Sequence, residues 1–299
     1  MKQSTTIQDD GLKPAFEPPP AFLYGILRSF VALASTLNLS QAVRQLDSTR
    51  QTLRRHITLL EELKGGALFD MRERRYYLTH LGERLLPEAE YLISNATSWI
   101  AGEMQFVNGL QVLRRESPDE AFFYQQQHQL DRAFASKGSI LQSAIKGWSN
   151  AEGQLANDSL RDVRPDCIIF RRINGKLVFT EVGENSSFAS WFGPAQAQST
   201  IGRTIGEMPG GGDFARLVDI AYVEIERNQG IRLDHIHTEI PKENSDGLVP
   251  ISYERLLLGG RFPDQSPAII SVVRRTYDLE INGVCETMIR RMPEEALMK

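Results

Sequence analysis

The chain has 299 residues and a formal net charge of −4, from 34 Lys and Arg against 38 Asp and Glu, and this length predicts two or three domains. Hydrophobic residues make up 41% of it, which is enough for a packed core, but no run of about 18 apolar residues occurs, so we expect no membrane span. Residues 1–20 lack the apolar centre of a signal peptide and predict a disordered tail, so we expect a cytoplasmic protein.

Three successive helices are predicted between residues 30 and 63. The first has apolar residues at the three-to-four spacing of a helix with one buried face. Ser40 is a favourable N-cap for a short second helix, and Asp47 and Ser48 favour a turn after it. The third helix begins at about Thr49 and carries arginines outside its apolar face. That apolar face consists of Leu53, Ile57, Leu60 and Leu63.

A basic hairpin is predicted after the third helix. Gly65 and Gly66 end the helix, since glycine readily adopts positive φ. Short strands at residues 68–71 and 76–78 can pair across a basic tip at residues 72–75. The order of helix, short helix, basic helix and hairpin predicts a winged helix-turn-helix.

Residues 30–82 closely resemble the DNA-binding domain of LysR-type transcriptional regulators in the order and spacing of their motifs. Arg50, Thr52 and Arg54 stand where that family usually has Gln, Ala and Ser, so its base preference cannot be transferred. The matching pieces are Phe30-Val31-Ala32-Leu33-Ala34, Ala42-Val43-Arg44-Gln45-Leu46, the run from Thr49 to Ile57, Leu60-Glu61-Glu62-Leu63, Leu68-Phe69 and Leu78-Thr79-His80-Leu81-Gly82.

The distribution of charge favours double-stranded DNA as a partner. From Arg28 to Arg84 there are ten Lys and Arg against six Asp and Glu, a net of +4, so the rest of the chain carries −8. A basic face is often only a solvated surface, but a positive module on an acidic chain concentrates the attraction for phosphate.

The predicted DNA-binding residues fall into two groups. The start of the second helix of such a motif enters the major groove, so we expect base contacts there. Arginines further along this helix and in the hairpin are expected at phosphates or in the minor groove. His56 is predicted to be a packed or surface residue. The base-contact set is Thr49, Arg50, Gln51 and Arg54, the phosphate set is Arg55, Arg72, Arg74 and Arg75, and Ser40 completes the interface.

A long coiled-coil linker helix is predicted over residues 83–115. Thr79 can cap it, Pro87 lies early in it, and apolar residues recur every seven positions. The LysR-type resemblance implies a homodimer, with two reading helices about one DNA turn apart on a dyad-symmetric operator. One alternative is a tetramer. The other is that the apolar side of this helix packs on the chain's own later domain. The predicted dimerisation residues are Leu85, Leu92, Trp99, Phe106 and Leu113.

Two strands, small helices, a longer helix and three strands are predicted after Pro165, as an antiparallel sheet with helices on one face. This order is similar to a PAS domain. The usual LysR-type effector domain has two α/β lobes, whose alternating strands and helices this region lacks. Core packing is the alternative role for most of the candidate pocket residues. These are Trp191, Phe192, Phe214, Tyr222, His235, Tyr253 and Arg255.

No cofactor is evident from the sequence. Residues 184–188 lack the cysteine of flavin-bonding PAS domains, and residues 214–228 lack a histidine for haem. His235 and His237 share one face of a strand, but without a third ligand we predict no metal site.

We therefore expect a multi-domain α+β transcriptional regulator whose PAS-like domain senses a small molecule or protein ligand. The first alternative is a PAS-like domain that serves only protein–protein interaction or oligomerisation. The second is an enzyme fused to a DNA reader, but no catalytic motif appears and we expect no enzyme. The predicted domains are a tail (1–20), a winged helix-turn-helix (21–82), a dimerisation linker helix (83–115), a helical connector (116–161, with helices at 121–134 and 140–155), a PAS-like sensor (162–285) and a C-terminal tail (286–299).

Overall fold

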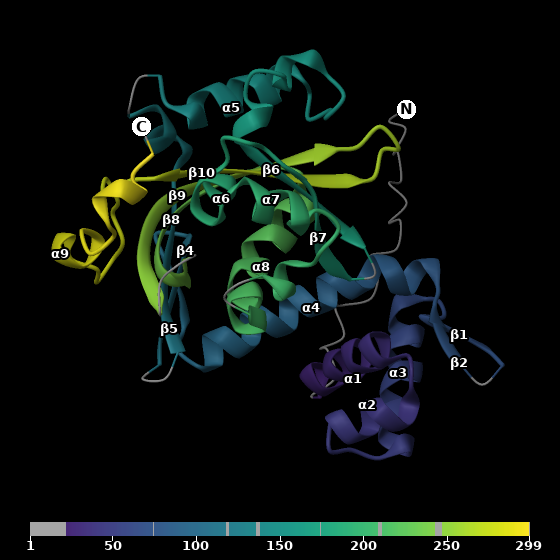
Figure 1. Ribbon diagram of the computed structural model, residues 1–299. Helices are drawn as coiled ribbons and strands as arrows, with labels where there is room; N and C mark the ends of the chain where they lie inside the picture. Colours follow the sequence, from purple (N-terminus) through teal and green to yellow (C-terminus); the bar gives the residue numbers. More distant parts are fainter. Residues whose placement is uncertain are drawn as a thin grey trace, which may run out of the picture. The chain divides into compact units, whose positions relative to one another are not determined.

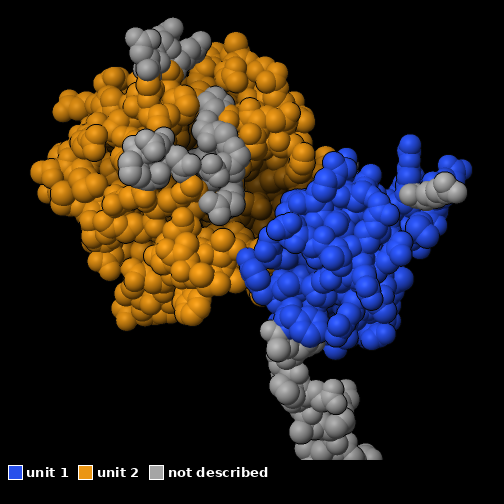
Figure 2. Space-filling model, turned by 90° about the horizontal axis from the view of Figure 1, so that it is seen from below, with its two compact units in different colours: residues 1–83 blue, residues 84–299 orange. Residues whose placement is uncertain are grey.

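The computed structural model divides into two compact units, Met1–Glu83 and Arg84–Lys299 (Figure 2). A helical unit followed by a large antiparallel sheet with helices confirms the predicted α+β class. The predicted disordered tail lies outside the described residues. The structure describes residues 22–73, 75–117, 120–135, 138–173, 175–208, 211–242 and 247–298.

In its described residues, unit 1 contains the helices α1 to α3, a two-stranded antiparallel hairpin and the start of α4 (Figure 1). Its core consists of apolar side chains from all three helices, among them Phe30, Ala42 and Leu53. Phe69 attaches the hairpin to this core, because its ring packs edge-on against Phe30 at 5.7 Å between centroids. The elements are α1 (Leu23–Thr36), α2 (Leu39–Gln45), α3 (Arg50–Lys64), β1 (Phe69–Arg72) and β2 (Arg75–Leu78).

Two details of unit 1 differ from the prediction. Asn38, rather than Ser40, caps α2, because its side-chain oxygen accepts from the backbone N–H groups of Ser40 and Gln41. Leu63 was predicted in the buried face of α3 but is 56% exposed. The buried stripe of α3 ends at Leu60 because the helix stops one turn later, at a left-handed Gly65.

Unit 2 is built on one eight-stranded sheet in which every neighbouring pair is antiparallel. The strand order is β3-β4-β5-β8-β9-β10-β6-β7. The predicted strands after Pro165 are confirmed, although the last one ends at Arg275 rather than residue 279. The strands are β3 (Met104–Val107), β4 (Leu110–Ser117), β5 (Glu120–His128), β6 (Cys167–Ile173), β7 (Lys176–Val182), β8 (Ile231–Pro241), β9 (Leu248–Arg261) and β10 (Pro267–Arg275).

Helices cover both faces of this sheet, so the prediction of helices on one face is wrong. Figure 1 shows α5 on one side and α8 on the other. Ile168 and Phe170 contribute to the core beside α8, whereas Cys167 and Ile169 contribute to the core beside α5. A continuous apolar strand such as residues 167–170 is typical of burial on both faces. The helices of unit 2 are α5 (Ile140–Asn150), α6 (Ser187–Phe192), α7 (Pro194–Thr200), α8 (Gly211–Asn228) and α9 (Glu286–Ile289), with 3-10 turns η1 (Leu130–Phe134), η2 (Asp158–Leu160), η3 (Arg164–Asp166), η4 (Ile205–Glu207) and η5 (Glu294–Ala296).

The predicted long linker helix is wrong beyond residue 100. Thr79 does cap α4 (His80–Ile100), since its hydroxyl accepts from the Gly82 N–H at 3.0 Å. The chain then turns into the β3–β4 hairpin through Asn108 and Gly109, which both have positive φ. Phe106 and Leu113 therefore lie in strands. Residues 83–115 do not form one continuous helix, so the predicted coiled coil cannot extend over all of them.

The predicted helix over residues 121–134 is also wrong, because this segment forms β5 and the short turn η1. β5 joins the middle of the sheet between β4 and β8. Its side chains alternate, with Phe123 in the core beside α8 and Tyr124 packed against Leu279 on the opposite face. The predicted helices at α5 and α8 are confirmed, within a few residues at their ends.

Candidate nucleic-acid interface

The exposed face of α3 presents the side chains that were predicted to contact bases. Arg50, Gln51 and Arg54 are exposed, whereas Leu53 and Ile57 on the opposite face are buried. The first turn of α3 contains no acidic residue. Because a helix N-terminus carries partial positive charge, this end of α3 attracts anions.

Ser40 and the start of α3 lie together. The Arg50 Nη2 donates a hydrogen bond to Ser40 Oγ at 2.9 Å, which joins α2 to α3 on the exposed side. Thr49 is the N-cap, and its Oγ1 accepts from the Thr52 N–H at 3.1 Å. The Thr49 hydroxyl is therefore partly used by the helix itself, and the Arg50 guanidinium is partly used by Ser40, so Gln51 and Arg54 are the freer side chains.

Arg55 lies over the ring of Phe22, with 5.7 Å from its guanidinium carbon to the ring centroid. Phe22 in turn stacks on His56 at 5.7 Å, and the His56 Nδ1 is 2.7 Å from the Ser29 hydroxyl. His56 is thus a packed residue, as predicted. The contacts of Arg55 direct it towards α1, away from the row formed by Arg50 and Arg54.

The hairpin carries a second set of exposed cations. Arg72 and Arg75 are opposite one another at the end of the β1–β2 ladder, and both are exposed. Arg72 donates to Asp70 at 3.2 Å, but such an exposed ion pair contributes little stability and is easily replaced. Arg74 lies outside the described residues.

A cavity of ≈ 130 Å³ lies in unit 2 between the sheet and the helices α6 and α8. Five of the seven predicted pocket residues line it, which are Trp191, Phe192, Tyr222, Tyr253 and Arg255. His235 was also predicted there but packs on His128, with ring centroids 3.9 Å apart, against the C-terminal segment on the opposite face of the sheet. The side chain of Phe214 lies outside the described part of the chain.

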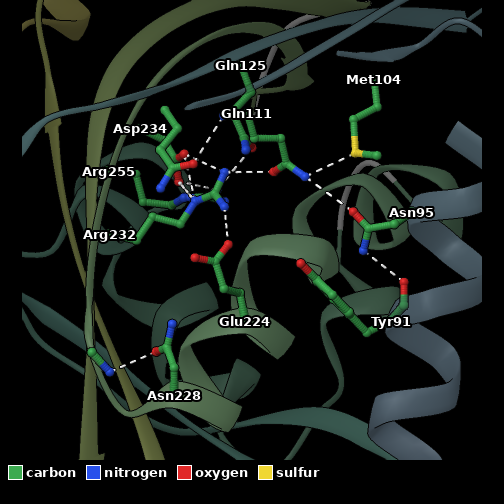
Figure 3. Close-up of polar contacts among 12 residues, drawn as sticks. Tyr91, Asn95, Met104, Gln111, Gln125, Glu224, Asn228, Arg232, Asp234 and Arg255 are labelled. Carbon is green, nitrogen blue, oxygen red and sulfur yellow. Dashed lines mark hydrogen bonds and ion pairs between the residues drawn. The ribbon is translucent and has the colours of Figure 1, made fainter. Parts of the chain in front are cut away.

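A buried polar network extends from this cavity to α4 (Figure 3). Asp234 is fully buried and accepts from Arg232 at 2.9 Å and from Arg255 at 2.9 Å. Burial raises the pKa of Asp234, but the two guanidiniums lower it further, so that the net pKa is below its usual value. Arg232 also pairs with Glu224 and donates to Gln111 at 2.8 Å.

Gln111 connects the network to α4. Its Nε2 donates to the Asn95 side chain at 3.3 Å, and Asn95 donates to the Tyr91 carbonyl oxygen at 2.8 Å (Figure 3). Gln111, Arg232 and Asp234 were not predicted from the sequence as members of a site. The only available signal was two charged residues at alternate positions of an apolar strand, which predicts that both point to one face.

His235 and His237, which were considered as metal ligands, have different hydrogen-bond partners. His235 Nδ1 accepts from the Glu280 N–H at 2.9 Å, and His237 Nδ1 is 2.8 Å from the Ser252 hydroxyl. Burial lowers the pKa of His237 and of His128 to about 4. In the residues that the structure describes, no three His, Cys, Asp or Glu side chains come together as a metal site, and no helix is long and apolar enough to cross a membrane.

The two cysteines differ in environment. Cys167 is buried in the sheet and its thiol contacts the Val163 carbonyl oxygen at 3.1 Å, whereas Cys285 is exposed. Burial raises the pKa of Cys167 to about 12. A hydrogen bond with the Thr287 hydroxyl lowers the pKa of Cys285.

Comparison with known proteins gives matches to the N-terminal unit. Residues 25–83 match the family described as "Bacterial regulatory helix-turn-helix protein, lysR family". The HTH-type transcriptional regulator XapR of Escherichia coli (strain K12) is 34% identical over 84 residues, 28% of this chain and 29% of that protein. The HTH-type transcriptional regulator DgdR of Burkholderia cepacia is 37% identical over 68 residues, 23% of each protein.

Among solved structures, the oxidized form of OxyR of Corynebacterium glutamicum is 28% identical over 26% of each chain, with a TM-score of 0.26. In each of these comparisons the matched region spans less than a third of the relative's length.

Proposed function

We propose that this chain, whose residues 25–83 form a LysR-type helix-turn-helix domain, is a sequence-specific DNA-binding transcriptional regulator. The observation that carries the proposal is the exposed row of Arg50, Gln51 and Arg54 along α3, opposite a buried apolar face. Guanidinium and amide groups are the side chains that read guanine and adenine in the major groove. An adjacent basic hairpin supplies further cations for phosphates.

The roles proposed for these side chains follow their placement. Thr49, Arg50, Gln51 and Arg54 lie at the start of α3, and Ser40 holds Arg50 from the neighbouring helix. We assign base contacts to this group. Phosphate or minor-groove contacts are proposed for Arg55, Arg72, Arg74 and Arg75.

Binding of full-length protein to duplex DNA at several salt concentrations tests this function. We expect the logarithm of the affinity to fall linearly with the logarithm of salt concentration, because cations on the protein displace counterions from the phosphates. Selection from random duplexes is expected to yield a dyad-symmetric site. Absence of salt-sensitive retention on any duplex would reject the proposal.

We propose a homodimer, with an association patch formed by Leu92, Trp99, Ile100 and Phe106. Leu92 is 51%, Trp99 67% and Phe106 60% exposed, so much apolar surface faces water at the end of α4 and on β3. Large exposed apolar side chains close together in the chain are a feature of interaction sites when they form one patch. Leu113, which we predicted to dimerise, is buried in the core of unit 2, and Leu85 is half-buried.

Sedimentation of the Trp99→Asp/Phe106→Asp variant tests the dimer. We expect a monomer, because burial of two carboxylates in an apolar interface is costly. The matched control is Ile173→Asp, which changes an exposed apolar residue of unit 2 outside the patch and should leave the dimer intact. A monomeric wild-type protein, or an unchanged variant, would contradict the patch.

A PAS-like sensing role for unit 2 is supported by the chain order and the cavity. β6 and β7, the helices α6 to α8, and the strands β8 to β10 follow one another as predicted, and these five strands are adjacent in the sheet. The strands β3 to β5 extend the sheet beyond that pattern. The exposed patch on α4 and β3 also fits the alternative, in which unit 2 serves only for association.

A further inference from the structure

The cavity of unit 2 combines aromatic walls with buried polar atoms of Arg255 and Ser271. Rings of Phe170, Trp191 and Tyr222 are among its lining. Arg255 Nε and Ser271 Oγ also belong to lining residues, are buried, and have no hydrogen-bond partner in the part of the chain that the structure describes. A buried donor without a partner is costly, so a ligand that bonds to both atoms would relieve this cost.

Among the described residues around the cavity, Arg275 is a cation without a carboxylate partner. Arg232 and Arg255 are matched by Asp234 and Glu224. Arg275 is also buried, and in the described residues its guanidinium bonds only to neutral oxygens, those of Ala296, Ser187 and Ser190.

Arg275 lies directly behind the cavity wall. It donates to the carbonyl and hydroxyl oxygens of Ser187 and lies over the Trp191 ring at 5.5 Å, and both of these residues line the cavity. Burial alone lowers its pKa to about 10. Arg275 therefore adds positive potential at this end of the cavity, four residues along β10 from Ser271.

The size of the cavity suits a ligand of about one ring. An apolar cavity of about 150 Å³ accommodates benzene, and this cavity measures ≈ 130 Å³. The aromatic lining favours a flat ring, since aromatic pairs gain energy beyond the area they bury.

From these observations, and resting on the proposed sensing role, we propose that unit 2 binds a small aromatic monocarboxylate, with its ring among the aromatic walls and its carboxylate at Arg255 Nε and Ser271 Oγ. We further propose that the network Arg255–Asp234–Arg232–Gln111–Asn95 couples occupancy of the cavity to α4. The network is continuous from a cavity-lining side chain to the helix that follows the DNA-binding unit in the chain.

Calorimetric titration of full-length protein with benzoate tests the ligand class. The protein used should be free of bound small molecules by native mass spectrometry. We expect benzoate to bind at least tenfold more tightly than benzamide, which lacks the charge, and than acetate, which lacks the ring. No benzoate binding at millimolar concentration, or equal binding of benzamide, would overturn the proposal.

Two variants locate the benzoate in the cavity. Ser271→Ala should weaken benzoate binding about fivefold or more, and Val273→Phe, which fills the cavity, should abolish it. Ser143→Ala on the exposed side of α5 is the matched control and should bind as wild type. Unchanged binding by both cavity variants would place the ligand elsewhere and reject the site. Duplex binding without benzoate is measured on the same preparations, so failure of the ligand proposal is distinguished from failure of DNA binding.

The coupling is tested separately with Asn95→Ala, which breaks the network at α4 and leaves the cavity unchanged. We expect benzoate to bind this variant as tightly as wild type, but to change its operator affinity at least threefold less. Ser94→Ala, the neighbouring residue of the same helix, is the control. A wild-type response of Asn95→Ala to benzoate, or no response of the wild type, would overturn the coupling.

Discussion

The two units place their arginines in opposite environments. In unit 1, Arg50 and Arg54 are exposed along α3, so water stabilises their charges. In unit 2, Arg232 and Arg255 are buried and share the carboxylate of Asp234. The difference teaches that the first set is available to an external polyanion, whereas most of the charge of the second set is committed to the fold.

The largest expected effect is on the buried side of this comparison. Asp234→Asn should lower the free energy of unfolding of unit 2 by about 3–5 kcal/mol, because it leaves two buried guanidiniums without their shared charge. All three tryptophans, Trp99, Trp148 and Trp191, belong to unit 2, so tryptophan fluorescence in urea reports on this unit.

The control is Asp264→Asn, which removes the partner of Arg171 in a partly exposed ion pair. It should cost less than about 1 kcal/mol. If both substitutions cost the same, buried and exposed arginines would not differ as described.

The next largest effect is on DNA binding by the exposed arginines of unit 1. Arg50→Ala should weaken binding to the selected operator by about 1–3 kcal/mol more than binding to random DNA, since base contacts carry specificity. Arg75→Ala should weaken both equally and reduce the salt slope by about 1. Fluorescence anisotropy with the two duplexes measures these changes. Equal losses for Arg50→Ala would move this residue to the phosphate group.

The pH dependence of stability tests the effect of burying a charged group on α4. Burial raises the pKa of Glu90 from 4.5 to about 7, against the attraction of Arg172. The folded state therefore favours the protonated form of Glu90. Its contribution to stability is most favourable below about pH 4.5 and becomes less favourable as the pH rises from 4.5 to about 7. His128 and His237 act oppositely, because their folded pKa of about 4 makes stability fall as the pH drops below 6.5.

Glu90→Gln should therefore raise stability at pH 8 by about 1–2 kcal/mol, a value discounted for the partial exposure of the group. Thermal unfolding between pH 5 and pH 8 measures this. Glu88→Gln, the exposed neighbour on α4, is the control. A wild-type protein whose stability does not decline between these pH values, once the histidine contribution is subtracted, contradicts the assignment to Glu90.

The smallest expected effect is at the cavity. Ser271→Ala should stabilise the unliganded protein by about 1 kcal/mol, because it removes a buried hydroxyl that has no hydrogen-bond partner among the described residues. The same substitution weakens benzoate binding in our proposal, so the two measurements have opposite signs. A loss of stability on this substitution would show that the hydroxyl already has a partner.

The helix-turn-helix was predictable because its signals are local. The turn at Asp47, the cap at Thr49 and the left-handed stop at Gly65 lie within a few residues of what they control. The end of α4 was mispredicted because a seven-residue spacing outweighed Asn108-Gly109, a strong hairpin signal. Phe106 and Leu113 lie on different strands of the β3–β4 hairpin, where Phe106 pairs with Gln111 and Leu113 pairs with Met104, so they share one face of the sheet. Phe106 is exposed close to the turn, whereas Leu113 is buried further from it.

The cavity was partly predictable and the network was not. Trp191, Tyr253 and Arg255 were found from the aromatic and charged composition of predicted strands and helices. Gln111 meets Arg232 across 121 positions of sequence, and this pairing depends on the register of strands that were predicted as helices. No local pattern encodes such a contact.

The difference between the two thiols makes the protein easy to label at one position. A thiol-reactive dye at neutral pH requires an accessible thiolate, which Cys285 offers and the buried Cys167 does not. A fluorophore on Cys285 would therefore report distances within the proposed dimer, or to an end-labelled oligonucleotide in the proposed DNA complex, without any engineered cysteine.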